Sequence, residues 1–252
     1  MTATTPVLEL VEVTKHFGAI KAVDGVSFAV MPGECVGLVG DNGAGKSTLV
    51  KIISGYHPQT SGSMQIQGQR VSFASPSDSR QHKIETVYQD LALVEQLDVA
   101  ANFFLGREKY TGWGRSLRYL DRKVMRSQAR EELQRIGISI PRMSATVSEL
   151  SGGQRQSIAI ARSIFWGSEC LILDEPTAAL GVKETNAVAE LIVRVIASGV
   201  AVVVVAHDID LITKLSSRIV VLRQGKVWSR LKTDEVSAAD IVHHITGMAR
   251  AA

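Results

Sequence analysis

Short apolar runs that end in polar residues recur along the 252-residue chain. Near-continuous apolar runs lie at 35–39, 170–173 and 200–206, a pattern typical of strands buried on both faces of a parallel sheet. Between the second and third runs, residues 183–198 show helical periodicity, with Gly199 as the expected C-cap. This strand–helix–strand order predicts parallel strands. The apolar helix positions are Ala187, Val188, Leu191, Ile192, Val195 and Ile196.

The rest of the pattern divides the chain into a β-rich start, a helical middle and a return to the parallel core. Strands are expected at 7–13, 26–30, 64–73, 84–88 and 218–222, and a final helix at 238–245. In the middle, a helix over 121–136 has Asp121 as N-cap and Gly137 just past its end. Its apolar face consists of Met125, Ala129, Leu133 and Ile136. We expect one domain over 1–252, with 7–89 and 166–252 as core and β-subdomain and 90–165 as helical subdomain.

Composition narrows the class of protein. The formal net charge is +3 and Lys and Arg form no dense run, so the sequence does not indicate nucleic-acid binding. The longest apolar run, 200–206, is far shorter than the roughly 20 residues of a membrane span. Residues 1–6 have neither the basic region nor the apolar core of a secretory signal, so we expect the chain in the cytoplasm. Cys35 and Cys170 begin predicted strands and are interpreted as buried thiols in a reducing compartment.

The segment Gly40–Ser47 fits the phosphate-binding loop pattern G-x-x-x-x-G-K-[ST]. It follows the apolar run 35–39 and precedes a helical stretch, which is the order that such a loop requires. Glycines let backbone N–H groups point inward at phosphate oxygens. Lys46 would reach the β- and γ-phosphates, and Ser47 would place its hydroxyl on Mg²⁺. The alternative is a chance glycine-rich turn, which the flanking strand and helix disfavour.

Four polar residues follow other predicted strands. Asp174 and Glu175 end the run 170–173, His207 ends 200–206 and Gln89 follows 84–88. Ligands of open parallel sheets bind beyond the carboxyl ends of the strands, so these side chains should gather at one edge. Asp174 suits Mg²⁺, Glu175 would polarise the attacking water, His207 would contact the γ-phosphate, and Gln89 would sense metal or water. Each has an ordinary alternative alone, as a loop histidine or a helix N-cap, but their clustering beside a phosphate loop favours the catalytic interpretation.

With these residues the chain resembles the nucleotide-binding subunits of ABC transporters from about Leu8 to about Gly225. Gln89 matches the Q-loop, Leu150–Gln154 (Leu-Ser-Gly-Gly-Gln) the family signature, Leu171–Glu175 Walker B and His207 the switch histidine. The resemblance implies an α/β fold of the P-loop NTPase (RecA-like) type, with a mainly parallel sheet, an N-terminal antiparallel β-subdomain and an inserted α-helical subdomain. The Walker A residues are Gly40, Asp41, Asn42, Gly43, Ala44, Gly45, Lys46, Ser47 and Thr48.

The resemblance also implies how ATP and Mg²⁺ are held. Phe17 matches the aromatic residue that stacks on adenine, with an ordinary core phenylalanine as the alternative. Ser47, Gln89 and Asp174 are the implied metal-side residues, and Lys46, Gln89, Glu175 and His207 the catalytic ones. Two copies would form a head-to-tail dimer in which each ATP lies between Walker A of one copy and the signature of the other, contributed by Ser151, Gly152, Gly153 and Gln154. Gly181 stands where the family usually has Asp, which puts a carboxylate contact across that dimer in doubt.

The segments 17–28, 40–43 and 178–184 look like the ATPase subunits of bacterial monosaccharide importers for ribose, xylose or fructose. This implies an integral membrane permease, docked after Gln89 on the helical subdomain, and a periplasmic or extracellular solute-binding protein. The chain would then sit peripherally on the cytoplasmic side of the cell membrane. Residues 110–114 are interpreted as a glycine-rich connection or a flexible surface loop. Two alternatives remain open: a soluble ABC ATPase acting on ribosomes or DNA, and a nucleotide-binding regulatory module without turnover.

Overall fold

A six-stranded sheet lies at the centre of the chain, in the order β12-β11-β3-β10-β9-β6. The structure is a computed structural model and describes residues 5–112, 119–140 and 142–247. Five of these strands are parallel, and β12 pairs antiparallel with β11 at one edge. The strands are β3 (Cys35–Val39), β6 (Ile84–Val87), β9 (Cys170–Asp174), β10 (Ala201–Val205), β11 (Arg218–Arg223) and β12 (Lys226–Lys232).

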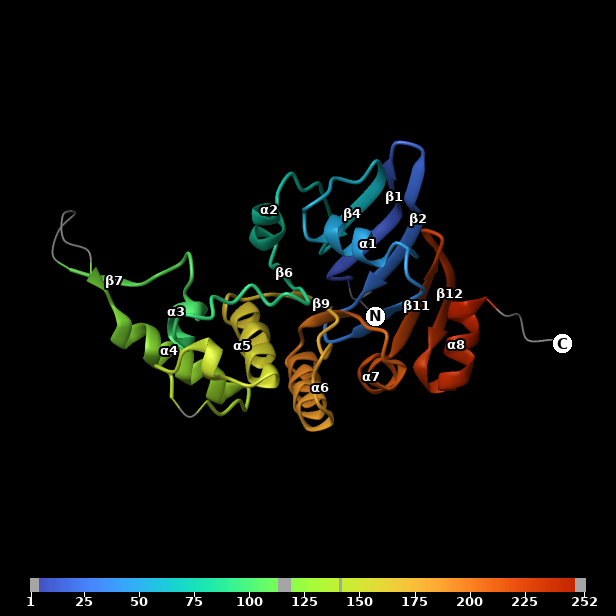
Figure 1. The fold of residues 1–252 in the computed structure, drawn as a ribbon. Coiled ribbons are helices and arrows are strands. Elements are labelled where there is room, and N and C mark those ends of the chain that lie inside the picture. Colours follow the sequence, from blue (N-terminus) through green and yellow to red (C-terminus); the bar gives the residue numbers. More distant parts are fainter. Residues whose placement is uncertain (1–4, 113–118, 141, 248–252) are drawn as a thin grey trace.

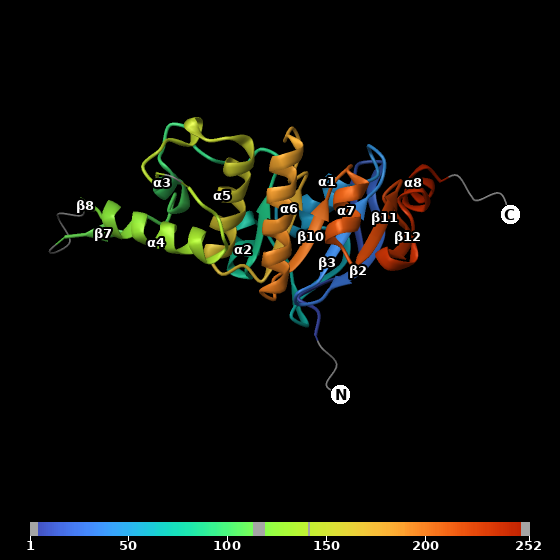
Figure 2. The same ribbon diagram turned by 90° about the horizontal axis from the view of Figure 1, so that it is seen from below.

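Side chains of the central strands alternate between two hydrophobic cores. In β10, Val202 and Val204 belong to one core, while Val203 and Val205 belong to the other. Helices α5 (Gly152–Phe165), α6 (Val182–Ala197) and α7 (Ile209–Leu215) contribute to the first core and lie side by side over that face (Figure 2). Helix α1 (Lys46–Ile53) contributes to the second core, together with the N-terminal sheet (Figure 1). Burial on both faces explains the near-continuous apolar runs of β9 and β10.

The N-terminal sheet is antiparallel, in the order β2-β1-β4-β5. Its strands are β1 (Leu8–Phe17), β2 (Ile20–Val30), β4 (Ser61–Ile66) and β5 (Gln69–Val71). The expected strand over 7–13 continues to Phe17 because β1 pairs with a neighbour on each side. The expected single strand over 64–73 is instead a hairpin. It turns at Gln67 and Gly68, whose φ angles of 50° and 76° suit a tight two-residue turn.

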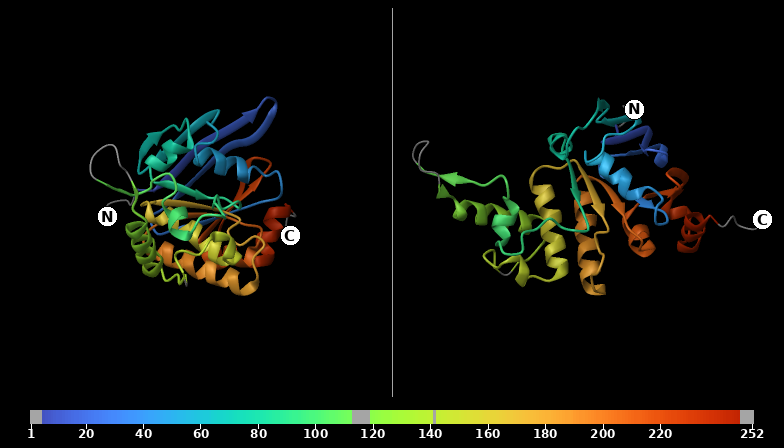
Figure 3. Two further views of the ribbon diagram at one scale, coloured as in Figure 1. Left: turned by 60° about the vertical axis from the view of Figure 1, so that its left-hand side comes forward. Right: turned by 45° about the horizontal axis from the view of Figure 1, so that its top comes forward.

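A helical segment extends to one side of the two sheets (Figure 3). Helix α4 begins after Asp121, whose Oδ1 accepts the N–H of Val124 at 3.0 Å, as the capping pattern predicts. The four residues expected on its apolar face are all buried, and the last of them, Ile136, is the C-cap. The elements of this segment are α3 (Val99–Phe103), the two-residue strands β7 (Tyr110–Thr111) and β8 (Tyr119–Leu120), α4 (Arg122–Arg135) and a 3₁₀ turn (Val147–Glu149), and they lead into α5.

Some details differ from the expectations. On α6, Ala187 is exposed. Ala189 is buried instead and lies on the same face as the buried positions 188, 191, 192 and 195. The C-cap of α6 is Ser198, and Gly199 follows it with a φ of 95°. Of the glycine-rich stretch 110–114, the first two residues form β7, and Trp113 and Gly114 lie outside the described residues. The remaining elements are α2 (Pro76–Gln81), a 3₁₀ turn (Thr233–Glu235) and α8 (Ala238–Thr246).

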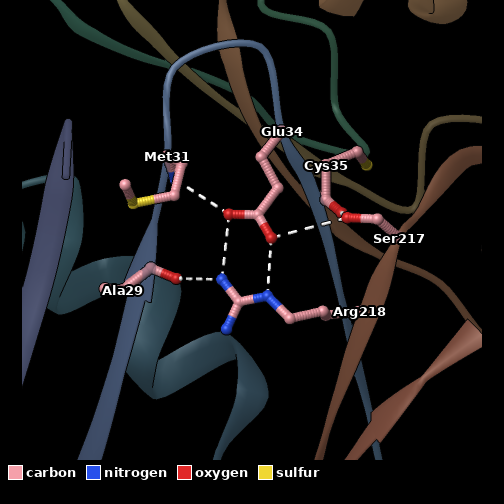
Figure 4. Close-up of polar contacts among 6 residues, drawn as sticks. All are labelled: Ala29, Met31, Glu34, Cys35, Ser217 and Arg218. Atoms are coloured by element: carbon pink, nitrogen blue, oxygen red, sulfur yellow. Dashed lines mark hydrogen bonds and ion pairs between the residues drawn. The ribbon is translucent and has the colours of Figure 1, made fainter. Parts of the chain in front are cut away.

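An ion pair joins the two sheets where β3 begins (Figure 4). Arg218 of β11 donates from Nε and Nη2 to the two carboxylate oxygens of Glu34, at 2.6 and 2.9 Å. Its Nη2 also donates to the carbonyl of Ala29 in β2, and the backbone N–H of Met31 donates to Glu34. Burial would raise the pKa of Glu34, but these hydrogen bonds and the charge of Arg218 outweigh burial and lower it.

Replacing Glu34 with Gln is expected to lower the free energy of unfolding by about 1–2 kcal/mol at pH 7, because charge-assisted hydrogen bonds are lost at a site where the Arg218 side chain is 40% exposed. The folded-state pKa is below the ordinary value of 4.5, so this stabilisation is present above pH 4.5. It is lost as the pH falls through the lowered pKa. Urea unfolding at pH 7, 5.5 and 4 checks this, with E235Q as control at an exposed pair with Lys232. An equal E34Q effect at all three values would contradict the prediction.

Candidate functional site

One pocket of about 540 Å³ opens at the carboxyl ends of β3, β9 and β10. Its predicted site residues come from four separate parts of the sequence, namely the loop before α1 with the first turn of α1, the end of β9, the segment just after β10, and Gln89, two residues after β6. The predicted site residues in its wall are Asn42, Gly43, Ala44, Gly45, Lys46, Ser47, Thr48, Gln89, Asp174, Glu175 and His207. The geometric expectation that strand-end residues meet at one edge of the sheet is therefore met.

The loop 40–45 approaches other backbone too closely for a side chain at two of its glycines. A Cβ at Gly40 would lie 2.2 Å from the carbonyl oxygen of Leu222, and a Cβ at Gly45 would lie 2.4 Å from that of Ala22. Both glycines also have positive φ angles, of 150° and 102°. The loop is held from the β11–β12 turn, where the N–H of Gly225 donates to the carbonyl of Ala44 at 3.0 Å. Glycine is thus required by contact as well as by conformation.

Lys46 begins α1 and its side chain is buried within the loop, with 7% of the residue exposed. Its Nζ donates to the carbonyls of Gly40 at 2.6 Å and Asp41 at 3.0 Å. Burial lowers the pKa of Lys46, and the nearby carboxylates of Glu175, Asp41 and Asp174 oppose that shift. The ammonium group therefore lies where an anion entering the loop would meet it.

Asp174 and Glu175 extend from β9 into the pocket. Glu175 has a φ of 52°, a conformation that is rare for a residue with a side chain, and its N–H donates to the carbonyl of Val205 in β10 at 2.8 Å. Its Oε1 lies 3.4 Å from Nε2 of His207. Burial raises the pKa of both carboxyl groups, while His207 and Lys46 act in the opposite direction on each. A strained backbone that is fixed by the neighbouring strand is typical of a residue held for chemistry.

The pocket suits a magnesium nucleotide. The hydroxyl of Ser47 and the carboxylate of Asp174 line the same wall, and both are hard oxygen ligands of the kind that Mg²⁺ prefers. The same wall contains the start of α1, where backbone N–H groups without helical partners could bind phosphate oxygens. Among the described residues, no three His, Cys, Asp or Glu side chains cluster as a metal site.

Phe17 is not part of the pocket wall. It ends β1, is 45% exposed and packs edge-on against His57, with ring centroids 5.4 Å apart. It pairs across the strands with Ile20, which does line the pocket. Lys15 Nζ lies over the ring, 5.2 Å from its centroid, and stacking of Phe17 on adenine stays a prediction.

The signature residues also lie outside the wall of the pocket. Ser151 is the N-cap of α5, and its hydroxyl accepts the N–H of Gln154 while the Gln154 side chain accepts the N–H of Ser151. Gly152 and Gly153 pack against Leu180 and Glu184, where a Cβ would come within 2.8 and 2.9 Å of those side chains. The phosphate loop and the signature therefore lie at separate places in one chain, the first in the pocket and the second at the start of α5.

Gly181, which stands where a carboxylate was expected, is the N-cap of α6 with a φ of −73°. No atom within 4 Å would obstruct a Cβ there, so neither conformation nor space requires glycine. Its N–H donates to Oε2 of Glu184 at 3.4 Å. The absence of the carboxylate is therefore a property of the sequence at this position and is not imposed by the fold.

Sequence reasoning missed part of the pocket wall. Ile20, Lys21 and Ala22 of β2 and Gln224 after β11 all line the pocket. Gln224 has a φ of 48° and precedes Gly225 in the β11–β12 turn. The only available signal was this Gln-Gly pair between two strands, which is typical of a hairpin turn. Nothing in the sequence indicated that the hairpin touches the phosphate loop.

Comparisons with known proteins agree with this geometry. The family profile described as ABC transporter matches residues 23–178. The chain is 42% identical over 242 residues to the xylose/arabinose import ATP-binding protein XylG of Sulfolobus acidocaldarius, covering 96% of this chain and 94% of that protein. It is 41% identical to the fructose import ATP-binding protein FrcA of Rhizobium meliloti, covering 97% and 95%. It is 37% identical to the ribose import ATP-binding protein RbsA 3 of Rubrobacter xylanophilus, but spans 48% of that longer protein.

Solved structures give the same picture. A nucleotide-free ATP-binding cassette from an ABC transporter aligns with a TM-score of 0.81 at 21% identity, over 94% of each chain, which shows the shared fold. A bacterial ABC transporter cassette solved as a dimer aligns with a TM-score of 0.73 at 28% identity, over 90% of this chain and 98% of that one.

The fold and the pocket define a phosphate-loop ATPase with a mainly parallel sheet, an antiparallel N-terminal sheet and a helical segment. The chain belongs to the ABC transporter family. As the ATP-binding subunit of such a transporter, it hydrolyses ATP in support of transport. No helix among residues 5–112, 119–140 and 142–247 is both long enough and apolar enough to cross a membrane.

Proposed function

We propose that this chain binds Mg-ATP and uses its hydrolysis to drive import of a monosaccharide through a partner permease. The observation that carries the proposal is the assembly of Lys46, Glu175, His207 and Gln89 around one pocket, in a chain similar over nearly its whole length to two sugar-import ATP-binding proteins. The names of these two relatives give xylose or arabinose and fructose as the imported sugars. A soluble ATPase acting on ribosomes or DNA is not favoured, because these relatives are import proteins.

The roles follow from position and chemistry. Lys46 would exchange its two loop carbonyl partners for phosphate oxygens when ATP enters. Ser47 and Asp174 would hold Mg²⁺, with Gln89 nearby, and the ion would neutralise charge on the β- and γ-phosphates. Glu175 would accept a proton from the attacking water, because its carboxylate faces the pocket from a fixed backbone. His207, within 3.4 Å of Glu175, would orient that water and hydrogen-bond the γ-phosphate.

Two copies would complete the site. The signature at Ser151–Gln154 lies outside the chain's own pocket, yet it offers a hydroxyl and helix N–H groups to an anion. We propose that it caps the ATP bound by a second copy in a head-to-tail dimer, in which Phe17 would stack on adenine. The partner cassette would be a second copy of this chain or a similar subunit. Because the N-cap residue Gly181 has no side chain, that interface would lack one polar contact.

The membrane partners are proposed from the same relatives. The helical segment after Gln89 would receive an integral membrane permease, and a periplasmic or extracellular solute-binding protein would deliver the sugar to that permease. The chain would lie peripherally on the cytoplasmic side of the membrane and would not contact nucleic acid. Selectivity for the sugar would reside in the permease and the binding protein, as the resemblance to importer ATPase subunits implies.

Purification of the native complex in mild detergent, followed by mass spectrometry, tests the proposal. We expect a polytopic permease to co-purify, and uptake of labelled monosaccharide to depend on a functional chain in the host. Complementation with wild type and with Glu175→Gln provides the matched pair, since only the first should restore uptake. Recovery in a soluble fraction with ribosomal or DNA-bound proteins would overturn the transport function.

A further inference from the structure

A second cavity, of about 780 Å³, lies between β6, α2, the segment after Gln89 and the end of α5. Arg162, in the last turn of α5, contributes to its wall. Its Nη1 donates to the carbonyl of Ala92 at 3.0 Å, and its Nη2 donates to the carbonyl of Leu91 at 3.3 Å. One guanidinium thus holds two consecutive carbonyls, and a planar fork of donors suits that task better than an ammonium group does.

The segment that receives these bonds has little regular structure of its own. Residues 88–94 belong to neither a helix nor a strand. Ala92 has a φ of 49°, which is unfavourable for a residue with a Cβ and persists only where surrounding contacts impose it. Leu91 and Leu93 pack against the hydrophobic core on either side of it. The position of Gln89, three residues before Ala92, therefore depends on how this short segment is held.

The surroundings keep the guanidinium available for the carbonyls. Glu85 of β6 is the nearby carboxylate, and burial raises its pKa while Arg80, Arg107 and Arg162 oppose that shift. Arg107 forms an ion pair with Glu85, with its Nη2 4.0 Å from Oε1 of the carboxylate. Arg107 also stacks over Trp166, with its Cζ 4.6 Å from the ring centroid. Glu85 thus balances the charge of Arg162 without taking up its two donor nitrogens.

We propose that Arg162 is a positioning residue that fastens the Leu91–Ala92 segment to the far end of α5. Helix α5 begins at the signature and reaches Arg162 about 15 Å further on, at 1.5 Å per residue. Gln89 at the pocket and the signature at the start of α5 are thereby held as one unit. The proposal rests on the proposed function insofar as both of these elements act on ATP.

A double-mutant cycle in the full-length chain tests this link. Arg162→Gln is expected to lower kcat for Mg-ATP about tenfold, because a small displacement of a water-positioning group is costly, while the Kd of ATP changes less than twofold. In a Gln89→Ala background the same Arg162→Gln change is expected to lower kcat no further. Arg162→Lys should recover part of the rate, because lysine keeps the positive charge and one donor nitrogen in place of two. If Arg162→Gln lowers kcat by the same factor in both backgrounds, the proposal is overturned.

Arg194→Gln is the matched control. Arg194 also donates from an exposed helix surface to a backbone carbonyl, that of Ile136 at 2.9 Å, but it does not touch the Gln89 segment. Arg194→Gln should lower the melting temperature about as much as Arg162→Gln does, while kcat stays within twofold of the wild-type value. If the two variants lose kcat equally, Arg162 is merely structural and the proposal fails.

Hydrogen–deuterium exchange separates this proposal from the proposed function, because it needs no turnover. Arg162→Gln should raise exchange in peptides covering 90–97 and 151–155 together, whereas Arg194→Gln should raise it in neither. Unchanged exchange in both peptides of Arg162→Gln would overturn the link. A wild-type chain that showed the link but released no phosphate would count against the proposed function alone.

Discussion

Replacing Glu175 with Gln is expected to lower kcat for ATP hydrolysis about 100-fold or more while ATP binding persists. Glutamine has nearly the same shape, so the backbone at 175, held by Val205, should not move. What is lost is the carboxylate that accepts the proton of the attacking water, and a positioned general base contributes about 10²–10⁴ in rate. The phosphate loop and Lys46 remain intact, so the substrate should still enter.

The same variant should trap a dimer. If each ATP lies between the pocket of one copy and the signature of the other, loss of hydrolysis leaves the interface closed. Light scattering should show the mass double from that of the 27.2 kDa monomer when Mg-ATP is added. Glu190→Gln, at an exposed position of α6, is the control and should retain turnover. Wild-type turnover in Glu175→Gln would remove Glu175 from the chemistry, and a mass that never doubles would argue against the shared sites.

Lys46→Ala is expected to weaken binding of Mg-ATP itself, by about 10- to 100-fold. The buried ammonium already bonds two loop carbonyls, and phosphate oxygens would replace them. A hydrogen bond to a charged group contributes about 1.5–3 kcal/mol, and each 1.4 kcal/mol corresponds to a factor of ten in affinity. Alanine removes the charge and both donor contacts together.

Calorimetric titration with Mg-ATP measures this loss. Lys214→Ala, at an exposed lysine whose Nζ donates to the Asn186 side chain at 3.3 Å, serves as control and should bind as the wild type does. A thermal scan of Lys46→Ala must show that the chain remains folded, because the carbonyl of Gly40 loses its partner. Binding as tight as in the wild type would contradict the assignment of the phosphate loop.

Much of the core could be predicted from the sequence. The apolar run 35–39 coincides with β3, and the helix after the glycine loop begins at Lys46. Asp121 caps α4, and Cys35 and Cys170 are both buried, with the pKa of each thiol raised to about 12, chiefly by burial. These features depend on local periodicity, on capping and on glycine conformation, all of which involve neighbours in sequence.

Other features were missed because they carry no local signal. Strand β12 alternates half-buried and exposed residues at a sheet edge, and its pattern is polar. Ala187 lies on the apolar side of the helical pattern by spacing alone, but the packing of α6 leaves it exposed. Ile20, Lys21 and Ala22 line the pocket from β2, and nothing in their local pattern indicated it.

The sequence by itself determined the chemistry: a phosphate loop, carboxylates and a histidine after strands, and a signature before a helix. Tertiary structure alone decided which of these residues meet. It brought the backbone of Ala22 and Leu222 against Gly45 and Gly40, and it kept the signature away from the chain's own pocket. It also joined Arg162 to carbonyls some 70 positions earlier. The physical reason is that motif chemistry belongs to side chains at short spacing, whereas backbone contacts between distant segments arise only when the sheets and helices pack.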